Sequence, residues 1–199
     1  MKPLTKNQLL EYFQVYRNVF PDWTVEHDTV LARTNGPVKQ VIAFQSLRSG
    51  AYRSSCSIDL LLPIPDGCQI LYQLLDKHSD VFPRQHPDLW QQVVKRMEEQ
   101  FIPPVRMRLD ANETLQYAEQ SVKPYGGDVG INCSTGLAAL NAYLGESERA
   151  LYWCSQVEVK AASMGRELAD WEIRKRQFTS ELREVVNAGK ARDFLESGS

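Results

Sequence analysis

The stretch VKQVIAFQSLRSGAYRSSCSIDLLL, Val38–Leu62, decides the fold. It predicts two β-strands joined by a turn that contains Ser-Gly, because apolar and polar residues alternate on both sides of that turn. In the second strand the apolar residues from Tyr52 onward are expected to face a core. Ser55 and Ser57 are expected to face water, since successive side chains of a strand point to opposite faces. Ser54 interrupts the apolar face and is expected near the exposed start of the strand.

The segments around this hairpin are predicted to be mainly helical. Thr5 and Gln8 have the spacing of a capping box, and the apolar residues that follow recur at helical spacing as far as Phe20. Pro87 stands where the first turn of a helix tolerates proline, and a second apolar stripe runs from there to Phe101. Beyond residue 135 the chain is predicted to be wholly helical, with a mobile tail after Gly189.

Two further elements are predicted from short patterns. Asp66 is a good N-cap residue, and the apolar residues of 70–75 follow it at helical spacing, which predicts a helix there. From Val105 to Asp110 apolar and charged residues alternate, which predicts a short strand.

These patterns predict an α+β fold in which a small antiparallel sheet packs against helices, with an all-helical C-terminal region. We expect an α+β domain over 1–122 and a helical region over 123–199, packed on the first as one unit. With 199 residues, of which 43% are hydrophobic, the chain is long enough to build a core.

Charge and cysteine usage restrict the classes of function. A formal net charge of -2 disfavours an electrostatic nucleic-acid binder, although Arg48, Arg53, Arg106 and Arg108 could share one basic sheet face. The four cysteines form no ligand pair and are expected to be free thiols, mostly buried, in a reducing cytoplasm. No signal peptide is recognised, and no apolar run is long enough to predict a membrane span.

Two places could carry chemistry or recognition. The loop Lys123–Thr135 is rich in glycine, and its Tyr125 and Asp128 are the predicted residues for contact with a partner. Cys133 precedes a predicted helix start, where a thiol pKa can fall, so a pair of Cys133 with His86 or His27 is conceivable. No metal site and no cofactor are predicted, because no paired histidine spacing and no nucleotide-binding motif occurs.

The N-terminal helix and the hairpin, with VIAFQS at 41–46 leading into SIDLLLPIP at 57–65, resemble a known family. It is a family of bacterial α+β proteins found among polymorphic-toxin immunity proteins and their relatives. The resemblance covers residues 5–65 and rests on pattern and on IAFQ at 42–45, so it carries over no functional residue. It implies a non-enzymatic inhibitor that binds a cognate toxin and occludes its site.

Three functions therefore stay open at the level of sequence. The first is a binding protein of the immunity type, whose partner is a protein. The second is an enzyme whose residues converge only in the fold, near Cys133 or Asp128. The third is a helical adaptor or homodimer that uses the apolar stripe of Trp171, Phe178 and Leu182.

Overall fold

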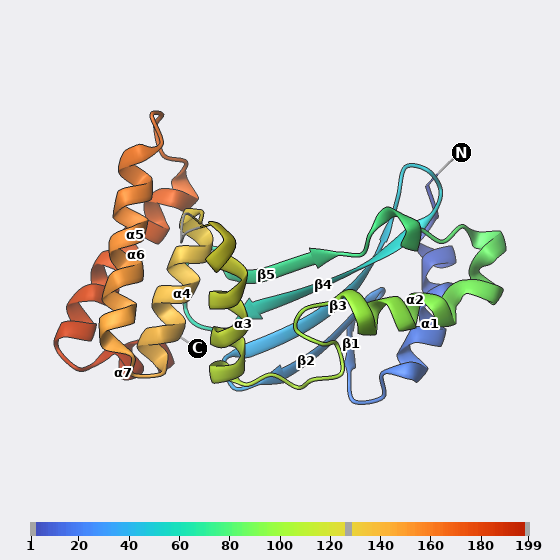
Figure 1. Cartoon of the computed structure of the whole chain (residues 1–199), viewed down its shortest axis with the longest axis horizontal. Coiled ribbons are helices and arrows are strands. Elements are labelled where there is room, and N and C mark those ends of the chain that lie inside the picture. Colours follow the sequence, from blue (N-terminus) through green and yellow to red (C-terminus); the bar gives the residue numbers. More distant parts are fainter. Residues whose placement is uncertain (1–2, 126–128, 198–199) are drawn as a thin grey trace. The chain divides into compact units, whose positions relative to one another are not determined.

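The structure is a computed structural model that describes residues 3–125 and 129–197 (Figure 1). Its strands form one five-stranded antiparallel sheet in which each strand pairs with the next along the chain. The elements in order are α1 (Lys6–Val19), β1 (Thr24–His27), β2 (Val30–Asn35), β3 (Val38–Ser46), β4 (Tyr52–Leu60), β5 (Cys68–Leu74), α2 (His86–Gln100), α3 (Ala111–Val122), α4 (Ile131–Tyr143), α5 (Ser147–Ser163), α6 (Asp170–Asn187) and α7 (Ala191–Glu196), with short 3-10 helices at Lys77–Ser79, Pro83–Gln85 and Lys123–Tyr125.

The described chain divides into two compact units. The first unit consists of Met1–Thr34, Lys39–Ser57 and Tyr72–Arg108. The second consists of Asn35–Val38, Ile58–Leu71 and Leu109–Ser199. None of the helices in the part of the chain that the structure describes has both the length and the apolar character needed to cross a bilayer.

The predicted start of α1 is confirmed. The Thr5 side chain accepts from the backbone N–H of Gln8, and the Gln8 side chain accepts from the backbone N–H of Thr5. Both bonds satisfy donors that the first turn of a helix leaves unpaired. The hairpin of β3 and β4 is confirmed as well, and it lies where the alternating sequence predicts it.

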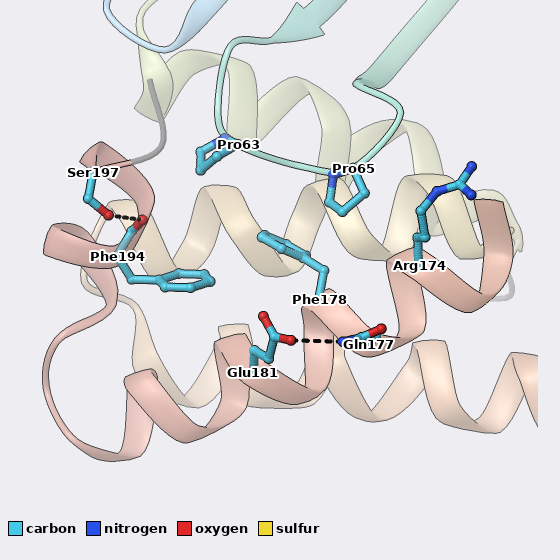
Figure 2. Close-up of a pocket in the computed structure, with 8 residues that line it drawn as sticks. All are labelled: Pro63, Pro65, Arg174, Gln177, Phe178, Glu181, Phe194 and Ser197. Atoms are coloured by element: carbon cyan, nitrogen blue, oxygen red, sulfur yellow. Dashed lines mark hydrogen bonds between the residues drawn. The ribbon is translucent and has the colours of Figure 1, made fainter. Parts of the chain in front are cut away.

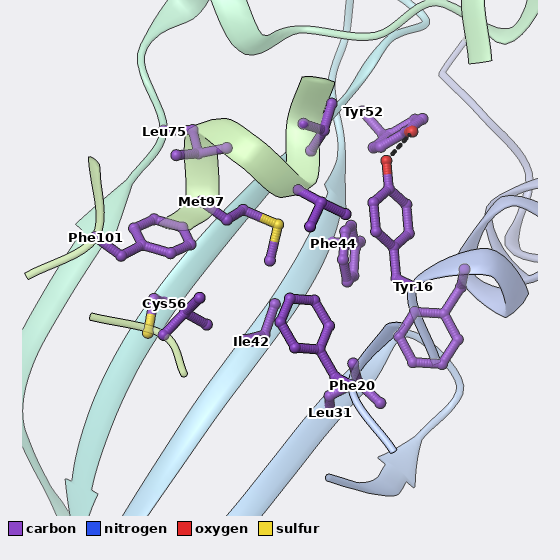
Figure 3. Packing of buried hydrophobic residues seen from close by; sticks show 14 of the residues in the cluster. Tyr16, Phe20, Leu31, Ile42, Phe44, Tyr52, Cys56, Leu75, Met97 and Phe101 are labelled. Carbon is purple, nitrogen blue, oxygen red and sulfur yellow. Dashed lines mark hydrogen bonds between the residues drawn. The ribbon is translucent and has the colours of Figure 1, made fainter. Parts of the chain in front are cut away.

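Helices α1 and α2 and the adjacent strands enclose the core of the first unit (Figure 3). Its centre is aromatic: the Tyr16 and Phe44 rings lie 4.4 Å apart between centroids. A chain of hydrogen bonds runs through this core. The Tyr16 and Tyr52 hydroxyls are 2.6 Å apart, and the Tyr52 hydroxyl is 2.8 Å from His86 Nδ1. Each of these buried polar groups is therefore hydrogen-bonded, as stability requires.

The second unit is built around α4. This helix is buried nearly all round and contacts α3, α5, α6 and α7. Gly136 faces the strand residue Cys68 so closely that an added Cβ would lie 2.6 Å from the Cys68 sulfur. Only glycine fits there without a shift, so this position fixes how closely the helix approaches β5.

The predicted helix after Asp66 is wrong, because the segment forms the strand β5. Asp66 adopts φ 61°, which is the left-handed region and not the extended conformation that an N-cap needs. The backbone N–H of Leu75 donates to the Ser54 carbonyl at 3.1 Å, so the end of this segment bonds to β4 instead of forming helical bonds.

The predicted strand from Val105 to Asp110 is also wrong, because the segment is irregular. The buried guanidinium of Arg33, 6% exposed, holds it in place. Arg33 donates to the carbonyls of Val105, at 2.9 Å, and Met107, and those carbonyls are therefore not available to a sheet ladder.

Several expectations about exposure are wrong. Ser54, Ser55 and Ser57 are all buried, so β4 is covered on both faces over this stretch. Trp171, which shares the apolar spacing of the buried Phe178 and Leu182, is 39% exposed. The tail expected to be mobile after Gly189 forms the helix α7 as far as Glu196.

Candidate partner-binding site

A pocket in the second unit lies between the loop after β4 and the helices α6 and α7 (Figure 2). Its volume is about 410 Å³. Phe178 from α6 and Phe194 from α7 form its aromatic wall, with ring centroids 6.0 Å apart. Pro63 and Pro65 from the loop form the facing wall. We call this site the Phe178–Phe194 pocket.

The loop wall is fixed by a buried lysine. Lys175 on α6 is 2% exposed, and its ammonium donates to the carbonyls of Pro65, at 3.0 Å, and Gly67, at 2.6 Å. Burial lowers the pKa of Lys175, because a low-dielectric surrounding disfavours the charged form. The two carbonyls replace the water that the ammonium loses, and they tie the loop to the helix that carries Phe178.

An ion pair stands at one edge of the pocket. The Arg174 guanidinium donates to both carboxylate oxygens of Asp66, at 2.9 and 2.8 Å. This hydrogen bond holds the pKa of the Asp66 carboxyl below its usual range. The pair is solvent-exposed, so its worth to stability is small, and its main effect is to set the position of the Arg174 side chain.

The remaining polar edge comes from α6 and α7. Gln177 donates its side-chain amide to the exposed Glu181 at 3.2 Å, and Ser197 donates its hydroxyl to the Phe194 carbonyl at 3.0 Å. The pocket thus combines an apolar interior with a cation at Arg174 and an anion at Glu181 on its rim (Figure 2).

The lining residues suit binding more than covalent chemistry. The pocket contains no cysteine and no histidine among its lining residues, and its serine hydroxyl donates to a backbone carbonyl. An apolar interior with a charged rim is instead the usual form of an anchor site for a protein partner.

The residues predicted for recognition lie elsewhere. Tyr125 ends the 3-10 helix Lys123–Tyr125, and Asp128 falls outside the described residues. Cys133 lies in the first turn of α4, inside the helix and not in the loop before it. Burial raises the pKa of the Cys133 thiol to about 11, which is the opposite of what an activated nucleophile requires.

The histidines and arginines singled out in the sequence serve separate local contacts. His86 is buried in the chain of hydrogen bonds with Tyr52, whereas His27 is exposed on β1. The arginines proposed as one basic face do not share a sheet surface, since Arg106 and Arg108 lie outside any strand. Among the described residues no group of three or more histidine, cysteine or acidic side chains could hold a metal ion.

The apolar stripe proposed for a homodimer is divided by the fold. Phe178 is 5% exposed and Leu182 is fully buried, while Trp171 is partly exposed. The sequence does not predict the pocket, because Phe194 belongs to a segment expected to be mobile and the prolines after β4 mark only the end of a strand. The apolar pair Phe194-Leu195 in ARDFLE was the signal that could have predicted α7.

The sequence matches no protein-family model, and no curated protein or solved structure is significantly similar to it.

Proposed function

We propose that this chain is a non-enzymatic protein-binding protein that anchors its partner in the Phe178–Phe194 pocket. The observation that supports this most directly is the composition of the pocket, with an aromatic and proline-lined interior, an oppositely charged rim and no reactive side chain. Interfaces concentrate their binding energy in such pockets, where a partner's aromatic or aliphatic side chain is fully desolvated.

The resemblance of residues 5–65 narrows the proposed partner to a bacterial toxin, which the chain would inhibit in the cytoplasm by occluding its active site. A preformed pocket suits this role, because binding then requires little ordering of the inhibitor. Lys175 and the Arg174–Asp66 pair supply that order in the free protein.

The experiment has two stages. The tagged chain is first used to isolate a stoichiometric protein partner from its native bacterium, and the partner is then produced separately. Isothermal titration calorimetry next compares the wild type with Gln177→Trp, which places a bulky side chain at the exposed pocket rim. The matched control is Ser180→Trp, which adds the same side chain at an exposed position of α6 outside the pocket lining.

We expect Gln177→Trp to weaken the Kd by about 30-fold, the size of a typical hot-spot loss, and Ser180→Trp to leave it unchanged. Equal Kd values for the two variants would rule out the pocket as the anchor. A stoichiometric small molecule in place of a protein partner would contradict the binding role and favour an enzyme. A wild-type chain that sediments as a homodimer through α6, without any other partner, would favour the adaptor.

A further inference from the structure

A second pocket lies in the first unit, where α1 begins and the segment before α2 passes by. Its volume is about 810 Å³, within the range of about 300–1,000 Å³ that is usual for small-molecule sites. Leu4, Phe82 and Pro83 give it an apolar wall. We call it the Arg84 pocket after its one charged lining residue.

The uncharged polar side chains that line this pocket are already engaged. Thr5 and Gln8 are hydrogen-bonded to each other in the capping box of α1. The Gln85 side chain accepts from the backbone N–H of Phe82 at 3.2 Å. These groups therefore hold the pocket in shape and have limited capacity left for a ligand.

Arg84 differs from them, because its guanidinium has no ion-pair or hydrogen-bond partner among the residues that the structure describes. No acidic residue is present among the described lining residues, and the first turn of α1 contains none. The positive end of the helix dipole adds to the Arg84 charge. The pocket is thus apolar inside and positive at its edge.

We propose that the Arg84 pocket binds a small amphipathic carboxylate, with its apolar chain against Leu4, Phe82 and Pro83 and its carboxylate on the Arg84 guanidinium. An arginine fork matches the two oxygens of a carboxylate, and an apolar body of moderate length fills the remaining volume. This inference is independent of the protein-binding role, since the two pockets belong to different units and share no residue.

The test compares three probes that share one apolar chain. Sodium octanoate, 1-octanol and octylammonium chloride are titrated into the full chain below their aggregation limits, and Kd values are measured by NMR from the backbone amide shifts of Leu4, Gly50 and Phe82. Arg84→Gln removes the charge. Arg17→Gln is the matched control, because Arg17 is also exposed on the first unit but lies in the last turn of α1.

We expect octanoate to bind about tenfold more tightly than 1-octanol, and octylammonium more weakly than either, as one charge-assisted hydrogen bond predicts. Arg84→Gln should weaken octanoate about tenfold and leave 1-octanol unchanged, while Arg17→Gln leaves both unchanged. Equal binding of octanoate and 1-octanol would overturn the proposal. An unaltered octanoate Kd in Arg84→Gln, or shifts confined to other residues, would overturn it as well. Dimerisation that Arg84→Glu abolishes, without octanoate binding, would assign the pocket to a second copy of the chain instead.

Discussion

Two buried cations, one in each unit, hold irregular segments of backbone in different ways. Arg33 donates to the carbonyls of the 105–107 segment and also pairs with Asp22 at 2.8 Å, and it lies 4.5 Å over the Trp23 ring. Lys175 donates only to the carbonyls of Pro65 and Gly67. The guanidinium has a hydrogen-bonded counter-ion and an aromatic neighbour, whereas the ammonium hydrogen-bonds to carbonyls and interacts with the Asp66 carboxylate only through space.

The difference shows how side-chain chemistry matches the segment to be held. A planar fork can serve several acceptors in fixed directions, so Arg33 also donates to Gln40 at 3.0 Å. An ammonium is a compact point charge that suits two converging carbonyls in one tight loop. We therefore expect the Arg33 network to contribute more to stability, and the Lys175 contact to act mainly on the shape of the Phe178–Phe194 pocket.

The largest effect should come from Arg33→Met. The substitution removes the Arg33 donor from the Val105 carbonyl and the Gln40 amide oxygen, and one of two donors from the Met107 carbonyl, which Gln40 also serves at 2.9 Å. The Asp22 carboxylate is 58% exposed and is solvated in the variant, so the loss of this network should cost about 3 kcal/mol. Urea denaturation followed by circular dichroism measures the loss. A smaller loss of unfolding free energy in Arg33→Met than in Lys175→Met would contradict the expectation that the Arg33 network contributes more to stability.

A smaller loss is expected from packing in the second unit. Gly136→Ala brings a methyl group against the Cys68 sulfur and should cost about 1–3 kcal/mol through overpacking. The double variant Gly136→Ala/Cys68→Ala removes the atom that is struck and should recover part of that loss. If the double variant recovers no stability, the contact between residue 136 and the Cys68 sulfur is not the source of the strain.

Lys175→Met should cost less, about 1–2 kcal/mol. The two loop carbonyls lose a donor, but the cost of burying an ammonium also disappears. The same variant should weaken partner binding by more than its stability loss suggests, because the proline wall is no longer fixed. Isothermal titration calorimetry compares the partner affinity of Lys175→Met with that of the exposed control Lys190→Met. Equal affinities would show that the conformation of the proline loop does not affect the binding site.

Acidification should destabilise the protein moderately, through the first unit. Burial lowers the pKa of His86, so the folded state keeps it neutral while the unfolded chain takes up a proton near its ordinary pKa of about 6.5. The unfolded state then binds more protons, and stability is lost as the pH falls through about 6.5. In His86→Gln the free energy of unfolding should depend less on pH in this range. An unchanged pH dependence would show that His86 does not cause it.

The smallest effect concerns the thiols of the second unit. The pKa of Cys133 is raised to about 11 and that of Cys68 to about 12, both by burial. At pH 8 both should react with iodoacetamide much more slowly than the same thiols in urea, as mass spectrometry can follow. Fast alkylation of native Cys133 would revive the enzyme hypothesis.

Sequence predicted the elements whose causes are local. The capping box at Thr5, the position of the β3–β4 hairpin and the proline at the start of α2 depend on a few neighbouring residues, and all three are confirmed. The exposure expected from the β4 alternation is wrong, because Ser55 and Ser57 are buried. The α+β class follows from them, because a short hairpin flanked by amphipathic helices has few other ways to bury its apolar face.

The errors fall where distant residues decide the local structure. The segment 105–110 alternates like a strand, yet its carbonyls serve Arg33, more than 70 residues away in the sequence. The segment 68–74 has helical spacing, yet it bonds to β4 and lies under Gly136. The site is missed for the same reason, because its two walls meet only when Lys175 reaches the proline loop.

The backbone at Asp66 has a consequence for engineering the pocket. A glycine would relax the φ of 61°, but it would also release the Arg174 side chain from its carboxylate. An asparagine tolerates that backbone and keeps one acceptor without the charge. Position 66 is not part of the pocket lining. A substitution there can therefore change which ligand charge the pocket prefers without altering any residue that lines it.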